Sequence, residues 1–110
     1  MPNIDITSDQ YRLINDILDQ FLEEKIQVWV FGSRSTFKAR KGSDLDLAIT
    51  SDQAIDTCQL AQLKQAFCEA RLPFRVDLMD MSCVSELFKA VIEKEKVLFE
   101  RGMGRRVGWV

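Results

Sequence analysis

Three aspartates lie in two segments that have the alternating pattern of β-strands. Asp44 and Asp46 are separated by one residue in the run DLDLAIT, and Asp77 lies in the later run FRVDLMD. Successive side chains of a strand point to opposite faces, so Asp44 and Asp46 share one face. Asp77 is out of phase with Val76 and Leu78, which predicts that it also projects away from the apolar face. We therefore expect three carboxylates on one side of a sheet.

Carboxylates held this close together suggest a particular chemistry. Like charges raise one another's pKa or disrupt a site unless a cation neutralises them. Hard divalent ions such as Mg²⁺ prefer oxygen ligands, and they commonly bind through a few carboxylates plus the phosphates of a substrate. Two such ions about 4 Å apart can activate an attacking oxygen and stabilise a leaving oxygen in phosphoryl or nucleotidyl transfer. Asp44 and Asp46 on one face could bridge the same two ions.

A Gly-Ser turn precedes these acids and suggests a phosphate-binding loop. The apolar run IQVWVF stops at Gly32 and Ser33. Glycine lets the backbone approach a ligand closely, and the amides and the Ser33 hydroxyl can donate hydrogen bonds to phosphate oxygens. Between the turn and the first aspartate lie four cationic residues, which could attract a triphosphate to an otherwise acidic protein: Arg34, Lys38, Arg40 and Lys41.

The elements that position these groups follow from periodicity, capping residues and proline. The first half should contain a helix starting at Thr7 or Ser8, a strand over 26–31 and a strand over 44–50. The second half should contain a helix opening at Ser51 or Asp52 and ending before Pro73, a strand over 74–80, and a last helix capped by Ser82. On that last helix we expect a shared apolar side of Leu87, Val91 and Leu98, and a solvated charged face over 93–96. This order predicts a small two-layer α/β sandwich, with a three- to four-stranded mixed sheet and helices mainly on one face.

The composition indicates one globular domain. The 110 residues are 46% hydrophobic and 29% charged, and we expect a domain over 1–100 followed by a flexible basic tail over 101–110. No apolar run approaches the length of a membrane span, and the polar start lacks the features of a signal peptide, so we expect no membrane association. The formal net charge of -2 argues against direct binding of nucleic acid.

Histidine is absent and cysteine is sparse. The lack of histidine excludes His-based triads and most zinc hydrolases, and it leaves the carboxylates as the main chemical resource. Cys58, Cys68 and Cys83 are odd in number and widely spaced. We expect them to be free thiols in the core of a cytoplasmic protein.

Simpler interpretations of the same residues stay open at this point. Taken alone, Asp44 and Asp46 could be surface residues at a strand edge, and the Gly-Ser turn could be only a turn. Asp80 competes with Asp77 for the role of third carboxylate, but its position in the alternation places it on the apolar face. No GxxxxGK[ST] run is present, so a Walker-type ATPase is unsupported.

Taken together, these residues resemble the nucleotidyltransferase superfamily related to DNA polymerase β. The pattern is Gly32-Ser33, ten intervening residues, Asp44-Leu45-Asp46, and Asp77 on a later strand. The wording FGSRS…SDLDLAI is similar, more narrowly, to the minimal nucleotidyltransferases (MNT). The resemblance extends to about the end of the last helix, and the three-part pattern is specific although each part alone is weak.

The resemblance implies a fold, an activity and roles for residues. The fold would be that of the polymerase β-like nucleotidyltransferases. The activity would be transfer of a nucleoside monophosphate from ATP or another nucleoside triphosphate to a hydroxyl, with two Mg²⁺ ions and release of pyrophosphate. By position, Asp44 and Asp46 would bind both metals, and Asp77 would complete the metal site and could accept the acceptor's proton. The nucleotide-binding residues would be Gly32, Ser33 and Arg34.

The resemblance also implies a partner. MNT proteins are commonly encoded beside a HEPN-domain protein, often an RNase toxin. We therefore expect a protein adenylyltransferase-like antitoxin that modifies its HEPN partner. The alternative is a non-catalytic, nucleotide-binding antitoxin that neutralises the partner by forming a complex with it. Because the core uses the whole length of the chain, we expect the acceptor surface to come from another chain or from self-association.

Overall fold

A four-stranded mixed sheet forms the centre of this computed structural model, which describes residues 4–101. In chain order its elements are α1 (Ser8–Phe21), β1 (Gln27–Phe31), α2 (Ser33–Thr36), β2 (Leu45–Thr50), α3 (Thr57–Glu69), β3 (Val76–Asp80), the 3₁₀ helix η1 (Met81–Cys83), α4 (Glu86–Glu95) and β4 (Val97–Phe99). The strands lie in the order β3-β2-β1-β4. β1 is antiparallel to β2 and β4, whereas β2 and β3 are parallel and are joined through α3. The predicted α/β sandwich with a mixed sheet is confirmed.

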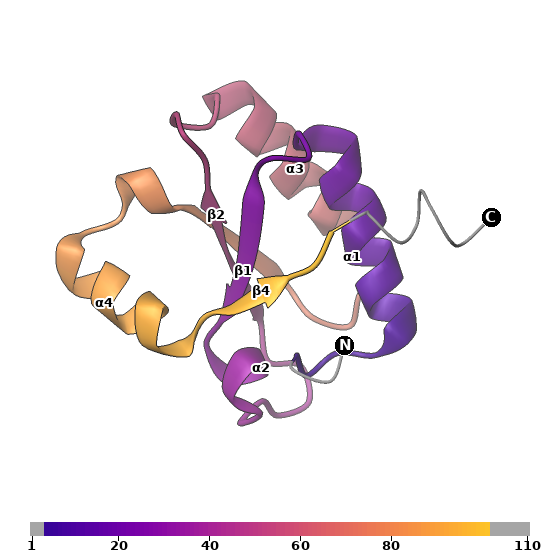
Figure 1. Cartoon of the computed structure of the whole chain (residues 1–110). Coiled ribbons are helices and arrows are strands. Elements are labelled where there is room, and N and C mark those ends of the chain that lie inside the picture. Colours follow the sequence, from indigo (N-terminus) through magenta and orange to yellow (C-terminus); the bar gives the residue numbers. More distant parts are fainter. Residues whose placement is uncertain (1–3, 102–110) are drawn as a thin grey trace.

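Two helices cover one face of the sheet and form the main core with it. Figure 1 shows α1 and α3 side by side on this face. The apolar members of the strand alternation point toward them and are fully buried: Val28, Val30, Leu45, Leu47 and Ile49. They pack against residues of the two helices and of β4, including Ile14, Leu18, Leu63 and Phe99. Each buried aliphatic side chain contributes roughly 1.5–3 kcal/mol, so this layer supplies most of the driving force for folding.

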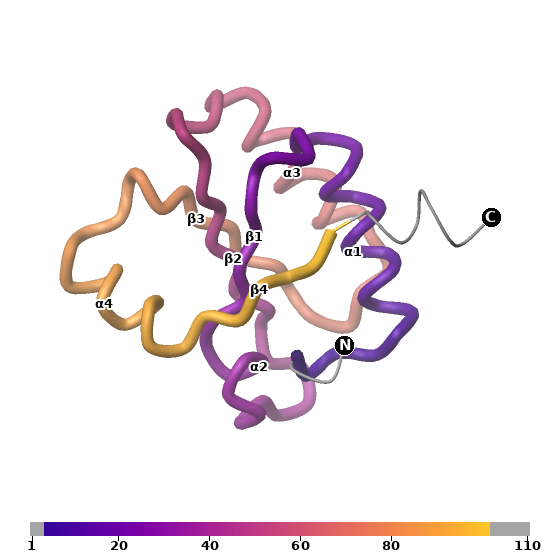
Figure 2. The backbone as a smooth tube through the Cα atoms, in the orientation of Figure 1, coloured from indigo at the N-terminus to yellow at the C-terminus, as the bar shows by residue number. Residues whose placement is uncertain are grey.

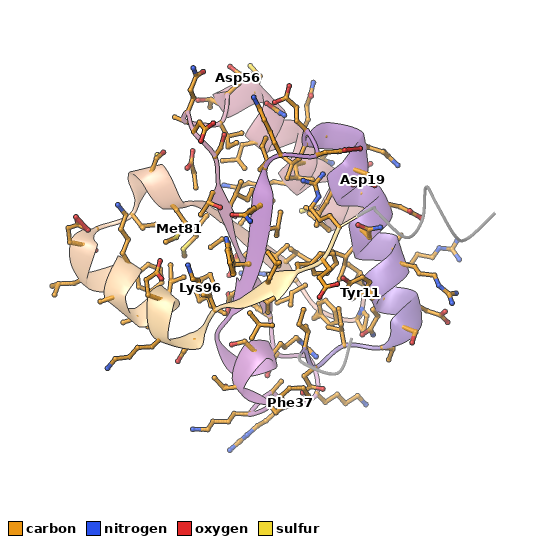
Figure 3. All side chains as sticks on the ribbon, in the orientation of Figure 1. Tyr11, Asp19, Phe37, Asp56, Met81 and Lys96 are labelled. Atoms are coloured by element: carbon orange, nitrogen blue, oxygen red, sulfur yellow. The ribbon has the colours of Figure 1, made fainter. Side chains whose placement is uncertain are left out.

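The predicted start of α1 is confirmed in detail. Thr7 is its N-cap, and the Thr7 hydroxyl accepts a hydrogen bond from the Gln10 amide at 3.1 Å. The Gln10 side chain accepts one from the Thr7 amide at 2.9 Å, which completes a capping box. Tyr11 in the next turn stacks on Phe99 of β4 with ring centroids 4.3 Å apart, and Figure 3 shows Tyr11 between α1 and that strand. The first helix is therefore tied to the last strand.

The opposite face, which carries the aspartates, is partly covered by α4. Figure 2 shows the backbone of α4 on the side of the sheet away from α1 and α3. A second, smaller apolar cluster fills this contact: Phe31, Ala48, Met81 and Ile92. Phe88 of α4 packs edge-on against Phe31, with ring centroids 5.9 Å apart. The sequence predicted helices mainly on the other face, but α4 covers part of this face and ends beside the acids.

Both predicted helix starts in the second half are wrong. The helix expected from Ser51 or Asp52 begins only at Thr57, where the Asp56 carboxylate accepts a hydrogen bond from the Gln59 amide. Ser85, not Ser82, caps α4. The Asp80 carboxylate accepts hydrogen bonds from the Ser82 amide and hydroxyl, which holds Ser82 inside η1.

The last helix is also shorter than its apolar pattern predicts. It ends at Glu95, and the β-favouring residues that follow pair with β1 as β4. The residues expected on its apolar side are instead exposed: Leu87 to 85%, Val91 to 46% and Leu98 to 39%. The side of α4 that faces the sheet is the one carrying Phe88 and Ile92.

The cysteines and the start of the predicted tail differ from expectation as well. The three cysteines are free, as predicted, but they are exposed, so their placement in the core is wrong. Arg101 is buried: its guanidinium donates to the carbonyls of Leu22, Glu23 and Ile26. The remaining residues of the predicted tail, 102–110, lie outside the described residues. None of the helices within 4–101 has the length and apolar character needed to cross a membrane.

Candidate active site

The predicted acids meet at one end of β2 and β3, two neighbouring parallel strands. Asp46 of β2 and Asp77 of β3 are direct neighbours in the parallel ladder, and Asp44 immediately precedes β2. Their neighbours in the alternation, Leu45 and Leu47, are fully buried in the main core. The sheet therefore places the three carboxylates on the opposite face, and all three are partly exposed there.

Asp46 is the most perturbed of these acids. Partial burial raises the pKa of its carboxyl to about 6, and the nearby carboxylates of Asp77, Asp44 and Glu95 raise it in the same direction. Arg75 neutralises little of this negative charge, since its guanidinium lies 4.0 Å from the Asp44 carboxylate and both side chains are well exposed. The site is therefore an accumulation of negative charge with little protein cation to balance it.

This donor set has the chemistry of a site for a hard divalent cation. Within residues 4–101, no three acidic or cysteine side chains are yet arranged to hold a metal ion. The carboxylates do supply oxygen donors and an electrostatic need for a cation, which is the combination that Mg²⁺ requires.

The Gly32 turn lies directly against Asp46. Gly32 has φ +78°, a conformation that side chains disfavour, and a Cβ placed there would overlap the Asp46 Oδ2 atom. The hydroxyls of Ser35 and Thr36 donate to the Gly32 carbonyl at 2.9 and 3.2 Å and hold the turn. Glycine at this position thus meets two separate demands, one of backbone conformation and one of space.

Ser33 begins the short helix α2 immediately after this turn. It is partly exposed, and its hydroxyl makes no hydrogen bond to another described residue. The hydroxyl is therefore available to donate to a ligand beside the acids.

Glu95 is a fourth acidic residue of the site, and the sequence did not indicate it. The Gly32 amide donates a hydrogen bond to Glu95 Oε1 at 3.0 Å. Glu95 is the last residue of α4, in the segment predicted to be a solvated charged face. No local pattern could have identified it, because the contact joins residues 63 positions apart and depends on where α4 packs.

Arg34 points into the protein. Its Nε and Nη2 atoms donate to the Ser43 carbonyl at 3.0 and 2.8 Å, and its Nη1 atom donates to the Asp5 carbonyl at 2.8 Å. The guanidinium also lies over the Phe74 ring, 4.2 Å from its centroid. Here Arg34 holds the loop that leads to Asp44. Its predicted contact with phosphate stays a prediction.

Two aromatic residues of β1 share the face of the acids. Phe31 is buried beneath α4 and serves packing. Trp29 donates its indole N–H to the Thr50 hydroxyl at 3.2 Å, and the Lys96 ammonium lies 4.2 Å from the centroid of its ring. Figure 3 shows Lys96 at the junction of α4 and β4.

A groove beside the acids has room for a substrate. Its volume is about 890 Å³, and it runs between the end of α3 and the free edge of β3. Asp44 and Asp77 line it together with the cationic Arg75 and Lys64 and the apolar Phe67. A second pocket of about 500 Å³, between α3 and α4, is lined by Asp80 and by none of the three predicted acids.

Comparison with known sequences gives two matches over most of the chain. A family model described as "Polymerase beta, Nucleotidyltransferase" matches residues 13–103. A Haemophilus influenzae protein named "Probable protein adenylyltransferase MntA" is 43% identical over 97 residues, which are 88% of this chain and 84% of that protein.

Solved structures of the same fold come from toxin–antitoxin complexes. One, described as the "Crystal structure of the toxin-antitoxin with AMP-PNP", matches with a TM-score of 0.69 and 21% identity over 86% of this chain and 76% of that one. Another contains a "tri-AMPylated Shewanella oneidensis HEPN toxin in complex with MNT antitoxin" and matches with a TM-score of 0.58 and 20% identity over 87% and 76%. At these identities the likeness establishes a shared fold.

Proposed function

The chain belongs to the polymerase β nucleotidyltransferase family, and from this premise we propose that it is a Mg²⁺-dependent protein adenylyltransferase. It transfers AMP from ATP to a hydroxyl of a HEPN-domain partner and thereby acts as an antitoxin. The observation that carries the proposal is the direct contact of the Gly32 turn with Asp46, whose ladder neighbour is Asp77. A turn suited to phosphates thus lies against acids suited to a divalent cation.

The turn residues and the acids have separate roles in the proposed reaction. The Gly32 and Ser33 amides and the Ser33 hydroxyl bind the triphosphate, and no side chain at Gly32 obstructs its approach. Asp44, Asp46 and Asp77 would hold two Mg²⁺ ions, which supply charge neutralisation and polarise the phosphate oxygens.

The transfer itself forms one bond and breaks one. The acceptor oxygen bonds to the α-phosphorus of ATP, and the bond from that phosphorus to the oxygen of the leaving pyrophosphate breaks. Asp77, which lines the groove beside β3, accepts the proton of the acceptor hydroxyl. The products are AMP joined to the partner by a phosphodiester, and pyrophosphate.

The partner follows from the relatives and from the groove. The Haemophilus relative is named as a protein adenylyltransferase, and structures of the same fold contain HEPN toxins. The groove at the free edge of β3 leads to Asp77, so a partner docked there can present a hydroxyl. The family resemblance suggests that this hydroxyl belongs to a tyrosine near the partner's active site. The added phosphate charge would repel RNA and switch the toxin off. The exposed free thiols fit the reducing cytoplasm.

Co-expression with the HEPN partner tests this function. Mass spectrometry should find the partner heavier by AMP with the wild-type protein and unmodified with Asp44→Asn/Asp46→Asn. Asp52→Asn is the matched control, because it removes an exposed carboxylate outside the site and should leave modification intact. A partner that is silenced equally by the wild type and the double variant, without modification, would instead establish neutralisation by complex formation.

A further inference from the structure

The carboxylate of Glu95 occupies a hydrogen-bond donor of the phosphate turn. Glu95 Oε1 accepts from the Gly32 amide at 3.0 Å, and this amide has no other described acceptor. The nucleotide-binding role proposed for the turn requires its amides to face phosphate oxygens. A carboxylate oxygen has the same charge and the same accepting geometry as a phosphate oxygen. Glu95 therefore stands where an oxygen of the triphosphate would stand.

The contact is specific rather than incidental. Glu95 is partly buried at the end of α4, and it lies close enough to Asp46 to raise the pKa of that carboxyl. A further acid near Asp46 is electrostatically unfavourable, and the charge-assisted hydrogen bond to Gly32 offsets part of this cost. Glu93, two residues earlier, instead pairs with Lys96 at 2.9 Å. Two glutamates of the same turn thus have different environments.

We propose that Glu95 is a positioning residue that holds the Gly32 amide in the nucleotide-free protein and yields it to a phosphate oxygen when the triphosphate binds. This inference rests on the proposed function. When the triphosphate binds, the Gly32 amide loses its hydrogen bond to the Glu95 carboxylate and gains one to a phosphate oxygen. Without nucleotide, the hydrogen bond to Glu95 keeps the turn in the same conformation. Glu95 also lies two residues before β4. Nucleotide binding is thereby linked to the end of α4 and to the strand that follows it.

Calorimetric titration with inorganic triphosphate and with ATP, both without Mg²⁺, tests the exchange. Glu95→Gln keeps the shape of the side chain, removes its charge and leaves a weaker acceptor, so it should bind both probes about fivefold more tightly than the wild type. Glu93→Gln is the matched control, because it removes the same charge from the same helical turn without touching Gly32, and it should change affinity less than twofold. Unchanged or weaker binding by Glu95→Gln, or an equal gain with Glu93→Gln, overturns the proposal.

The amide of Gly32 provides a second readout that does not depend on catalysis. In ¹⁵N–¹H NMR spectra without ligand, Glu95→Gln should move the Gly32 resonance, and triphosphate should move it in the wild type. If the Gly32 resonance moves neither with Glu95→Gln nor with triphosphate, the inference is overturned. If both results appear but no AMP reaches the partner, the proposed function fails and the exchange stands. If AMP is transferred and these results are absent, the proposed function stands and the exchange fails.

Discussion

At the scale of single residues, the negative charge of Asp46 lowers the stability of the metal-free protein, whereas the proposed function requires this charge. Its pKa in the folded protein, about 6, lies above the ordinary value of 3.8. The stability that the protonated Asp46 carboxyl contributes is therefore fully present below pH 4, and it is lost as the pH rises through 6. Removing the charge should relieve the repulsion from Asp77 and Asp44.

We predict that Asp46→Asn stabilises the metal-free protein at pH 7.5 by about 1 kcal/mol, a value reduced from the full pKa shift because the group is partly exposed. Thermal denaturation from pH 4 to 8 with a chelator should show a higher melting temperature and a flatter profile between pH 4 and 6. The same variant should lose AMP transfer. A variant that is less stable than the wild type at pH 7.5 would contradict this account.

The turn residues make a second prediction at this scale. Ser33→Ala removes a hydrogen bond to a charged phosphate, worth about 1.5–3 kcal/mol, and should lower kcat/KM about 10- to 100-fold. Gly32→Val should do more damage, because a Cβ there overlaps Asp46 Oδ2 in a positive-φ turn. Gly42→Val is its control: Gly42 has φ +81°, but a Cβ there meets no atom within 4 Å. Equal kinetic losses in the two glycine variants would show that backbone strain, and not the site, is responsible.

At the scale of elements, the loop between α2 and β2 is held from inside the protein. Arg34 bridges the carbonyls of Ser43 and Asp5 with three nitrogen atoms, and the loop leads to Asp44. A lysine keeps the charge but cannot reach both carbonyls. Arg34 therefore joins the N-terminal segment, the loop and the first acid into one unit.

We predict that Arg34→Lys lowers kcat for AMP transfer about tenfold while changing KM for ATP little, because the acids lose their alignment. Its unfolding free energy should fall by about 1–2 kcal/mol, since the buried carbonyls lose hydrogen bonds. Steady-state kinetics and chemical denaturation measure both effects. A rise in KM at constant kcat would restore the original expectation that Arg34 contacts the phosphates.

At the scale of the whole molecule, a largely buried ion pair connects the end of the described chain to α1. Arg101 Nη2 lies 3.1 Å from the Asp19 carboxylate, and these side chains are only 7% and 11% exposed. Arg101 also satisfies carbonyls after the end of α1, which β1 follows. Arg101, which follows β4, thus holds the end of the described chain against α1.

We predict that Arg101→Ala costs about 3–5 kcal/mol of unfolding free energy, because it removes the partner of a buried charge and the donors to three carbonyls. Urea denaturation measures the loss. Lys25→Ala is the control, since its pair with Glu23 is well exposed and should matter by less than about 1 kcal/mol. A loss in Arg101→Ala no larger than that of the control would show that Arg101 does not stabilise the fold.

The sequence by itself determined three of the four strands of the sheet, together with the positions of the three acids and of the turn. Alternation in DLDLAIT and RVDLMD placed Asp44, Asp46 and Asp77 on one face, and the break at Gly32 located the turn. These features are local: a period of two and a glycine at positive φ can be read within a few residues. The same local rules identified Thr7 as a candidate for the start of α1.

Only the tertiary structure decided what surrounds those residues. The packing of α4 across the acid face brings Glu95 to Gly32, and the burial of Arg34 turns a predicted phosphate ligand toward backbone carbonyls. An exposed Leu87 fits the same helical periodicity as a partly buried Phe88, so the periodicity did not reveal which side of α4 meets the sheet. Contacts of this kind join residues far apart in the chain, and their geometry is set by how whole elements pack, which no local pattern encodes.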